Sequence, residues 1–291
     1  MRTVSIDMGT TVLLIGHGSR KTAGNEEILR FADTWRTHHP DWRIEVCFIE
    51  HADVLLNAGL DNAAADSRRV IVAPLILNAA GHVKMDIPQA VDGARARHPG
   101  VEFVCVPPLG MGREIYDILR QRIDHLLRDL AVPDPRTTGI ILLGRGSSDA
   151  GANGEIAKMA RWLFEGMQHD LVDIAFTGIT LPRLETVVQR QVKLGMTQIV
   201  IQPIYLFNGV LIERIQQQVV RLRQCYPHIA FALGSYFGFD KGIYAIADAR
   251  VRDHGKPTGM PECDGCKYRL AAAHDHHDHH HNHAHDHVHS N

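Results

Sequence analysis

The chain has 291 residues, enough for one large or two medium domains, and its 45% hydrophobic and 22% charged residues are typical of a globular protein with a buried core. A net charge of −2 gives no basic surface for nucleic acid, and no apolar run reaches the ~20 residues that span a bilayer. We therefore expect neither nucleic acid nor a membrane as a partner.

Strands and helices alternate through the first half of the chain. The apolar run from Thr11 to Ile15 predicts a buried strand that leads into Gly16-His17-Gly18-Ser19. Expected after it, in chain order, are a helix from about residue 24, a strand at 44–48, a helix at about 54–65, a strand at 70–77, a loop at 78–82, a helix ending near residue 97, a strand at 101–106 and a helix at about 112–130. This alternation predicts an α/β fold with a parallel sheet.

The second half repeats this pattern. Gly16-His17-Gly18-Ser19 is matched by Gly144-Arg145-Gly146-Ser147, 128 positions later, and Ile115-Tyr116 is matched at the same offset by Ile243-Tyr244. Such a steady offset indicates two copies of one α/β unit. We predict domains at 1–131 and 139–254, the second being a degenerate copy, and a tail at 255–291, where the apolar periodicity has stopped.

Three polar residues of the first copy are missing from the second. His17, Glu50 and His82 are replaced by Arg145, Gly178 and Leu211, so the first copy is predicted to carry the chemistry. All three follow predicted strands, and strand ends of a parallel sheet converge on one edge. Two imidazoles and a carboxylate suit Co²⁺, Ni²⁺, Fe²⁺ or Zn²⁺, with positions left open for a substrate.

Other chemistries fit this loop poorly. Ser19 lacks the strand–G-x-S-x-G–helix context of a hydrolase nucleophile, and the loop lacks the G-x-x-x-x-G-K-[ST] pattern of nucleotide-binding proteins. A histidine phosphatase would need Arg directly before His17, where this chain has Gly16.

Several motifs resemble one enzyme family. They are His17-Gly18-Ser19-Arg20, the segments 48–52 and 78–88, and, in the second copy, the segments 144–147 and 203–211. Over about residues 10–250 the chain resembles the sirohydrochlorin cobaltochelatases, the class II chelatases of cobalamin synthesis. The resemblance implies two tandem chelatase-like domains, each a mainly parallel sheet flanked by helices, that insert Co²⁺ into sirohydrochlorin. The related siroheme ferrochelatases share the histidine pair, so Fe²⁺ insertion is an alternative. A non-catalytic cobalt or nickel storage protein is another.

The resemblance also implies roles for individual residues. His17 and His82 become metal ligands and proton acceptors, for which imidazole, with a pKa of about 6.5, is suited at neutral pH. Glu50 becomes an assisting base or third ligand. Sirohydrochlorin carries eight carboxylates, and we expect Ser19, Arg20, Lys84 and Arg145 to bind them. For each cation alone, a solvated surface charge is the alternative.

The tail contains two further metal-binding patterns. The segment from Met260 to Cys266 resembles the M-x-C-x-x-C motif of long members of the family, with one more residue between Met260 and Cys263, and this resemblance implies an iron–sulfur cluster at Cys263 and Cys266. A homodimer through this region would supply four thiolates, while half a zinc site or a redox dithiol is the alternative. Ten histidines are predicted to form a low-specificity metal reservoir, with a dispensable solvated tail as the alternative. They are His274, His276, His277, His279, His280, His281, His283, His285, His287 and His289.

The cysteines and the N-terminus together indicate the compartment. Residues 1–10 contain one Arg and no apolar core, so they do not form a secretory signal. Five cysteines, an odd number, argue against a disulfide framework. We expect a cytoplasmic protein in which Cys47, Cys105 and Cys225 are small buried residues.

Overall fold

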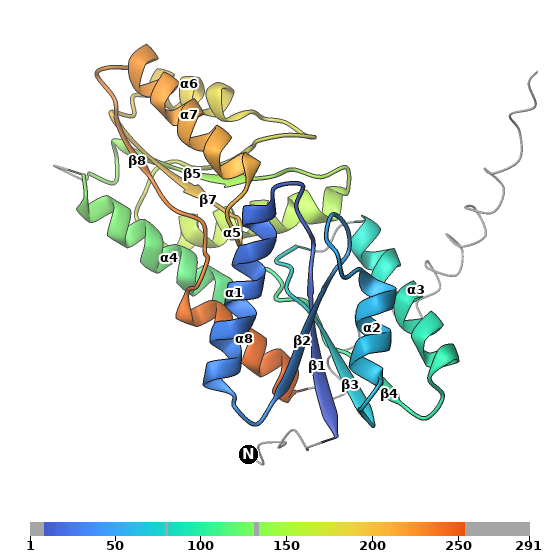
Figure 1. Cartoon of the computed structure of the whole chain (residues 1–291). Helices are drawn as coiled ribbons and strands as arrows, with labels where there is room; N and C mark the ends of the chain where they lie inside the picture. The colour runs from blue at the N-terminus through green and yellow to red at the C-terminus, as the bar shows by residue number, and fades with distance from the viewer. Residues whose placement is uncertain (1–8, 79–80, 131–133, 254–291) are drawn as a thin grey trace, which may run out of the picture.

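Two four-stranded sheets, each with helices on both faces, make up the molecule (Figure 1). The structure is a computed structural model that describes residues 9–78, 81–130 and 134–253. The strands are β1 (Thr10–Gly16), β2 (Arg43–Phe48), β3 (Arg69–Pro74), β4 (Glu102–Cys105), β5 (Thr138–Gly144), β6 (Val172–Phe176), β7 (Gln198–Pro203) and β8 (Ala230–Leu233). The helices are α1 (Thr22–His38), α2 (Leu56–Ala64), α3 (Gly81–Arg97), α4 (Arg113–Arg128), α5 (Ala150–Gly166), α6 (Leu184–Lys193), α7 (Val210–Cys225) and α8 (Lys241–Arg252).

Both sheets have the same topology. The strand orders are β2-β1-β3-β4 and β6-β5-β7-β8, and every pair is parallel. From β1 the chain crosses first to one side, to β2, and then to the other, to β3, so the switch point of the first sheet lies between β1 and β3. Ligands of open α/β sheets bind in the crevice at the carboxyl end of such a point. The predicted α/β fold, with two parallel-sheet copies, is confirmed.

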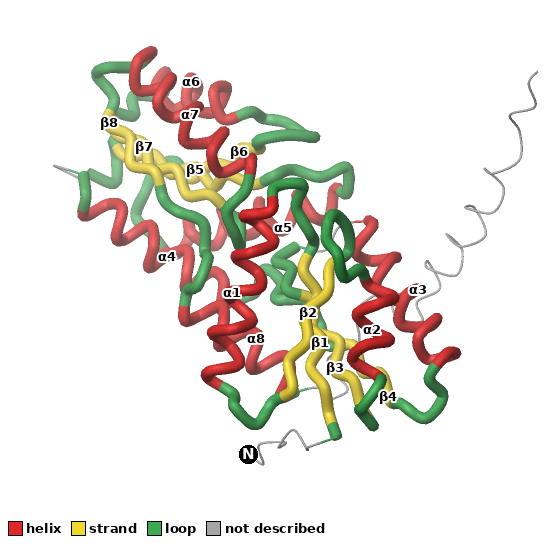
Figure 2. The backbone as a smooth tube through the Cα atoms, in the orientation of Figure 1, coloured by secondary structure: helices red, strands yellow, loops and turns green. Residues whose placement is uncertain are grey.

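Alternating side chains of each strand enter different cores. Leu13 and Ile15 of β1 pack with α2 and α3 in an outer core, and α6 and α7 cover the far face of the second sheet in the same way. Val12 and Leu14 face a central core that both sheets share with α1, α4, α5 and α8. Figure 2 shows these four helices between the two sets of strands. The halves are therefore joined through one apolar core.

The last helix of each copy packs against the sheet of the other copy. α4 follows β4 in the chain but lies on β7 and β8, whereas α8 follows β8 and lies on β3 (Figure 1). The predicted domain boundaries, 1–131 and 139–254, treat each copy as continuous, and they stay a prediction. What the structure adds is that neither sheet is covered by helices of its own copy alone.

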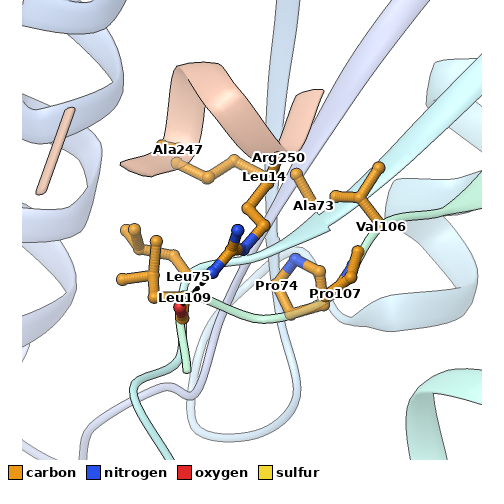
Figure 3. A pocket seen from close by; sticks show the side chains of 9 residues that line it. All are labelled: Leu14, Ala73, Pro74, Leu75, Val106, Pro107, Leu109, Ala247 and Arg250. Carbon is orange, nitrogen blue, oxygen red and sulfur yellow. Dashed lines mark hydrogen bonds between the residues drawn. The ribbon is translucent and has the colours of Figure 1, made fainter. Parts of the chain in front are cut away.

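Two arginines at equivalent positions stabilise the packing of α4 and α8 on the sheet of the other copy. Arg122 of α4 donates hydrogen bonds to the carbonyls of Tyr236 (3.0 Å) and Phe237 (2.9 Å). Arg250, 128 positions later in α8, donates to the carbonyls of Pro108 (3.3 Å) and Leu109 (3.0 Å). Figure 3 shows Arg250 beside a void of about 10 Å³ between α8 and the first sheet. The same contact is therefore made twice, once from each copy to the other.

Three sequence expectations need correction. The predicted strand 70–77 ends at Pro74, because Leu75 makes the last bond of the ladder, to the carbonyl of Ile15, and β1 itself ends one residue later. His82, expected in a loop, lies in the first turn of α3. Cys225, expected to be buried, is exposed, since the buried stripe of α7 passes through Val219 and Leu222 and leaves position 225 on the solvent side.

The other two described cysteines, Cys47 and Cys105, are buried, as predicted. Burial raises the pKa of the Cys47 thiol to about 12. Among the described residues, no helix combines the length and the apolar character that crossing a bilayer requires.

This difference in exposure predicts selective labelling. In a Cys263→Ser/Cys266→Ser background, iodoacetamide at pH 8 should modify Cys225 within minutes and leave Cys47 intact, because a thiol of pKa about 12 is almost entirely protonated there and is shielded from the reagent. Peptide mass spectrometry of native and urea-unfolded samples measures this. Rapid native labelling of Cys47 would contradict the burial.

Candidate functional site

The loop after β1 places His17 at the carboxyl edge of the first sheet. Gly18 has a φ of +94°, which glycine adopts without strain, and a Cβ there would lie 1.7 Å from the carbonyl oxygen of Glu50. The backbone N–H of Glu50 donates to the carbonyl of His17 (3.1 Å), so the loops after β1 and β2 are fastened together. This close approach explains why glycine follows His17.

The two loops bring His17 and Glu50 into contact. Nδ1 of His17 lies 3.5 Å from Oε1 of Glu50, and both side chains are roughly half exposed. The prediction that these residues converge on one edge agrees with this distance.

His51 lies on the other side of the same carboxylate, with Nε2 3.4 Å from Oε2 of Glu50. Its backbone is left-handed, with a φ of 53°. The sequence analysis included His51 in a motif but gave it no role. A signal was present, because the second copy has an apolar residue, Ile179, at the matching position.

Asparagines stabilise the corresponding loops in both copies. Asn25 accepts from the backbone N–H of Ser19 (2.8 Å) and donates to the carbonyl of His51 (2.7 Å). In the second copy Asn153 accepts from the N–H of Ser147 (2.9 Å). The loop geometry was thus kept in both halves while the side chain at position 17 or 145 changed.

The remaining predicted residues are spread around this edge. Arg20 is exposed, with Nε 3.5 Å from Nε2 of His51. The hydroxyl of Ser19 accepts from the backbone N–H of Lys21 (3.2 Å), a turn contact at the start of α1. His82 is the second residue of α3, after the strand that neighbours β1. Arg145 is exposed after β5, in the second copy.

Lys84 is already paired. Its Nζ lies 3.1 Å from Oδ2 of Asp149, which also caps the N-terminus of α5 by accepting from the N–H of Gly151 and Ala152. The hydrogen bond from Lys84, followed by those backbone bonds, lowers the pKa of Asp149. The ion pair joins the start of α3 to the start of α5 in the other copy.

Further contacts hold the two carboxyl edges against each other. Asn78, after β3, donates to the carbonyl of Ala152. Lys21, at the start of α1, pairs with Glu213 in the first turn of α7. The carboxyl edges of the two sheets therefore face one another and are in contact.

Part of the predicted metal-binding set lies outside the described residues. Cys263, Cys266 and the ten tail histidines are all beyond residue 253. Within the ranges that the structure does describe, no three His, Cys, Asp or Glu side chains gather closely enough to hold a metal ion. We therefore consider the close pair of His17 and Glu50 as the place at which a substrate metal would bind.

Comparison with known proteins shows that this chain is similar to one protein family over most of its length. The family model CbiX matches residues 11–126 and again 139–254. A sirohydrochlorin cobaltochelatase of Priestia megaterium is 37% identical over 274 residues, which cover 92% of this chain and 87% of that protein. A sirohydrochlorin ferrochelatase of the same organism is 27% identical over 251 residues, 86% of this chain and 92% of its own length.

A solved structure agrees with the fold. SirB from Bacillus subtilis with Fe³⁺ superposes with a TM-score of 0.71 and 27% identity, covering 85% of this chain and 96% of SirB. The two matches to the family model, which together span most of the chain, and the relative with 37% identity lead to the same conclusion. This protein belongs to the CbiX family, a family of sirohydrochlorin chelatases.

Proposed function

We propose that this protein inserts Co²⁺ into sirohydrochlorin in cobalamin biosynthesis. The observation that carries the proposal is the contact of His17 with Glu50 after β1 and β2, beside the switch point of the first sheet, with α3 and His82 beginning after β3 on the other side of β1. The relative of higher identity, a cobaltochelatase at 37% against a ferrochelatase at 27%, favours Co²⁺.

The reaction exchanges a divalent ion for two protons. Two pyrrole N–H groups lose their protons and M²⁺ binds the macrocycle nitrogens, so the site must both deliver a metal and accept protons. Nδ1 of His17 lies 3.4 Å from the carbonyl oxygen of Gly18 and 3.5 Å from the Glu50 carboxylate, so a proton on Nδ1 has acceptors beside it and the Nε2 lone pair is left for the metal. We assign Glu50 to orienting His17 and assisting proton removal, and His82 to the second metal contact.

A direct insertion assay tests this function. Purified protein is mixed anaerobically with sirohydrochlorin and Co²⁺, Fe²⁺ or Ni²⁺ at matched free concentrations, and insertion is followed by the change in the absorption spectrum. We expect the highest kcat/KM with Co²⁺. A higher value with Fe²⁺ would instead support siroheme synthesis. Tight binding of Co²⁺ or Ni²⁺ without insertion would support storage and overturn the enzymatic proposal.

The tail predictions lead to a second measurement. Deleting residues 271–291 removes the ten clustered histidines and should leave kcat unchanged at saturating Co²⁺, because the proposed chemistry uses residues of the first copy. At limiting Co²⁺ we expect slower insertion, since the tail is proposed to raise the local metal concentration. Loss of turnover at saturating metal would contradict the reservoir role.

Three other expectations remain proposals. An iron–sulfur cluster at Cys263 and Cys266 rests on the motif alone, as does a homodimer formed through it. A cytoplasmic location rests on the odd number of cysteines, five, which argues against a disulfide framework.

A further inference from the structure

The carboxyl edge of the second sheet has its own side-chain cluster. Arg145, Thr177 and Tyr205 follow β5, β6 and β7, the strands around the second switch point. The hydroxyl of Thr177 lies 2.6 Å from that of Tyr205, and the N–H of Gly178 donates to the carbonyl of Arg145 (3.0 Å). The degenerate copy thus keeps an ordered edge at the place where the first copy has His17 and Glu50.

This edge carries two arginines whose side chains have no carboxylate partner within the described part of the chain, Arg145 and Arg214. Arg214 belongs to the second turn of α7. Burial raises the pKa of Tyr205 to about 12, while Thr177 and then the charges of Arg145 and Arg214 act to lower it, so both guanidinium groups lie near this phenol. By contrast, Arg122 and Arg190 are paired with Asp240 and Asp173. The second edge therefore has two cations available for an anion.

Beside these cations is an exposed apolar residue in a strained conformation. Ile179 has a φ of 59° and is 61% exposed, and β-branched residues rarely adopt this region. It stands where the first copy has His51, with almost the same φ of 53°. Neither burial nor backbone preference accounts for isoleucine here, but contact with an apolar ligand would.

The geometry places this edge opposite the proposed insertion site. The contacts of Lys84 with Asp149, Asn78 with Ala152 and Lys21 with Glu213 hold the two carboxyl edges face to face. A flat macrocycle that brings its central nitrogens to His17 therefore turns part of its rim toward the second edge. That rim carries carboxylates around an apolar ring, which matches guanidinium groups beside Ile179.

We propose that Arg145, Arg214 and Ile179 form a substrate-recognition surface, in which the two guanidinium groups bind rim carboxylates of the tetrapyrrole and Ile179 contacts its ring. This inference rests on the proposed function. It assigns the degenerate copy to substrate recognition and the first copy to the metal. Arginine suits this task because its planar, permanently charged group binds carboxylates through two parallel hydrogen bonds.

The test separates recognition from chemistry. In an Arg145→Gln/Arg214→Gln variant we expect the KM for sirohydrochlorin to rise at least ~10-fold, since a hydrogen bond to a charged group contributes enough for such a change. The kcat at saturating substrate should stay within about twofold of wild type, because neither residue touches the metal. Arg221→Gln, which alters an exposed arginine of the same helix α7, is the control and should behave as wild type.

Equilibrium binding gives a readout without turnover. Titration of metal-free protein with sirohydrochlorin should show a Kd that rises with NaCl for wild type and Arg221→Gln but depends less on salt in the double variant. Equal KM, Kd and salt dependence for the double variant and the control would overturn the inference. If wild-type protein binds the tetrapyrrole but inserts no metal, the proposed function fails, and these Kd values still decide whether the arginines recognise it.

A third variant tests the apolar contact. Asparagine adopts the left-handed region more readily than isoleucine, so Ile179→Asn should fold with equal or higher Tm while its KM for sirohydrochlorin rises several-fold. Leu194→Asn, at a residue that is 59% exposed and lies at the C-terminal end of α6, is the control. An unchanged KM in Ile179→Asn would show that Ile179 is not part of the substrate-recognition surface.

Discussion

Replacement of His17 by alanine is expected to reduce the kcat of Co²⁺ insertion by at least ~100-fold, the range in which removing a proton-transfer group lowers enzymatic rates. The loss is expected because His17 supplies both a metal contact and the imidazole next to Glu50. His82→Ala should have an effect of similar size if it provides the second metal contact. The measurement is the rate of cobalt-sirohydrochlorin formation at saturating substrate and metal.

The fold should survive both changes. His17 is partly exposed on a loop whose glycines and asparagine hold its shape, so the Tm of His17→Ala should remain close to that of wild type. His228→Ala, which removes an exposed imidazole before β8, is the matched control and should retain full turnover. Native rates in both His17→Ala and His82→Ala would show that the insertion site lies elsewhere.

The largest loss of stability is expected for Arg122→Ala. Besides the carbonyls of Tyr236 and Phe237, Arg122 binds Asp240 with Nη2 2.9 Å from Oδ2, and only about a fifth of its side chain is exposed. Removing it leaves several partly buried acceptors and one carboxylate without their donor. We expect the free energy of unfolding to fall by about 3 kcal/mol, measured by urea denaturation.

The internal repeat provides the comparison for this variant. Arg250 occupies the equivalent position, and its hydrogen bonds go to the carbonyls of Pro108 and Leu109, so Arg250→Ala should lower the free energy of unfolding by a smaller amount, about 1–2 kcal/mol. Arg221→Ala, at an exposed site, should change it by less than about 0.5 kcal/mol. An Arg122→Ala variant as stable as the Arg221→Ala variant would show that these contacts do not stabilise the packing of α4 on the second sheet.

Much of the site could be predicted from the sequence because its residues stand at strand ends. Once the apolar runs place His17 after one strand and Glu50 after the next, parallel pairing brings them to one edge, and the 3.5 Å contact agrees. Lys84 shows the limit of this reasoning. Its helix was expected, but its partner Asp149 is 65 positions away in the other copy, and no local pattern connects them.

His51 and Ile179 show a second limit. Their side chains differ, yet both have nearly the same left-handed backbone, which β-branched residues such as isoleucine rarely adopt. The loop contacts that impose this conformation, such as Asn25 with the carbonyl of His51, depend on residues brought together by folding. Comparing the sequences of the two copies shows that the residue at this position differs. Only the structure shows that its backbone is left-handed in both copies.

The amino-acid sequence by itself determined the alternation of strands and helices, the duplication, and the asymmetry that leaves His17, Glu50 and His82 in one copy. Those features follow from local periodicity and from a comparison of two segments at a steady offset. Only the tertiary structure decided that α4 covers the second sheet and α8 the first. The physical reason is that an apolar helix stripe specifies that a face must be buried but not which sheet buries it, and the choice is made by distant partners such as the loop carbonyls that Arg122 and Arg250 bind.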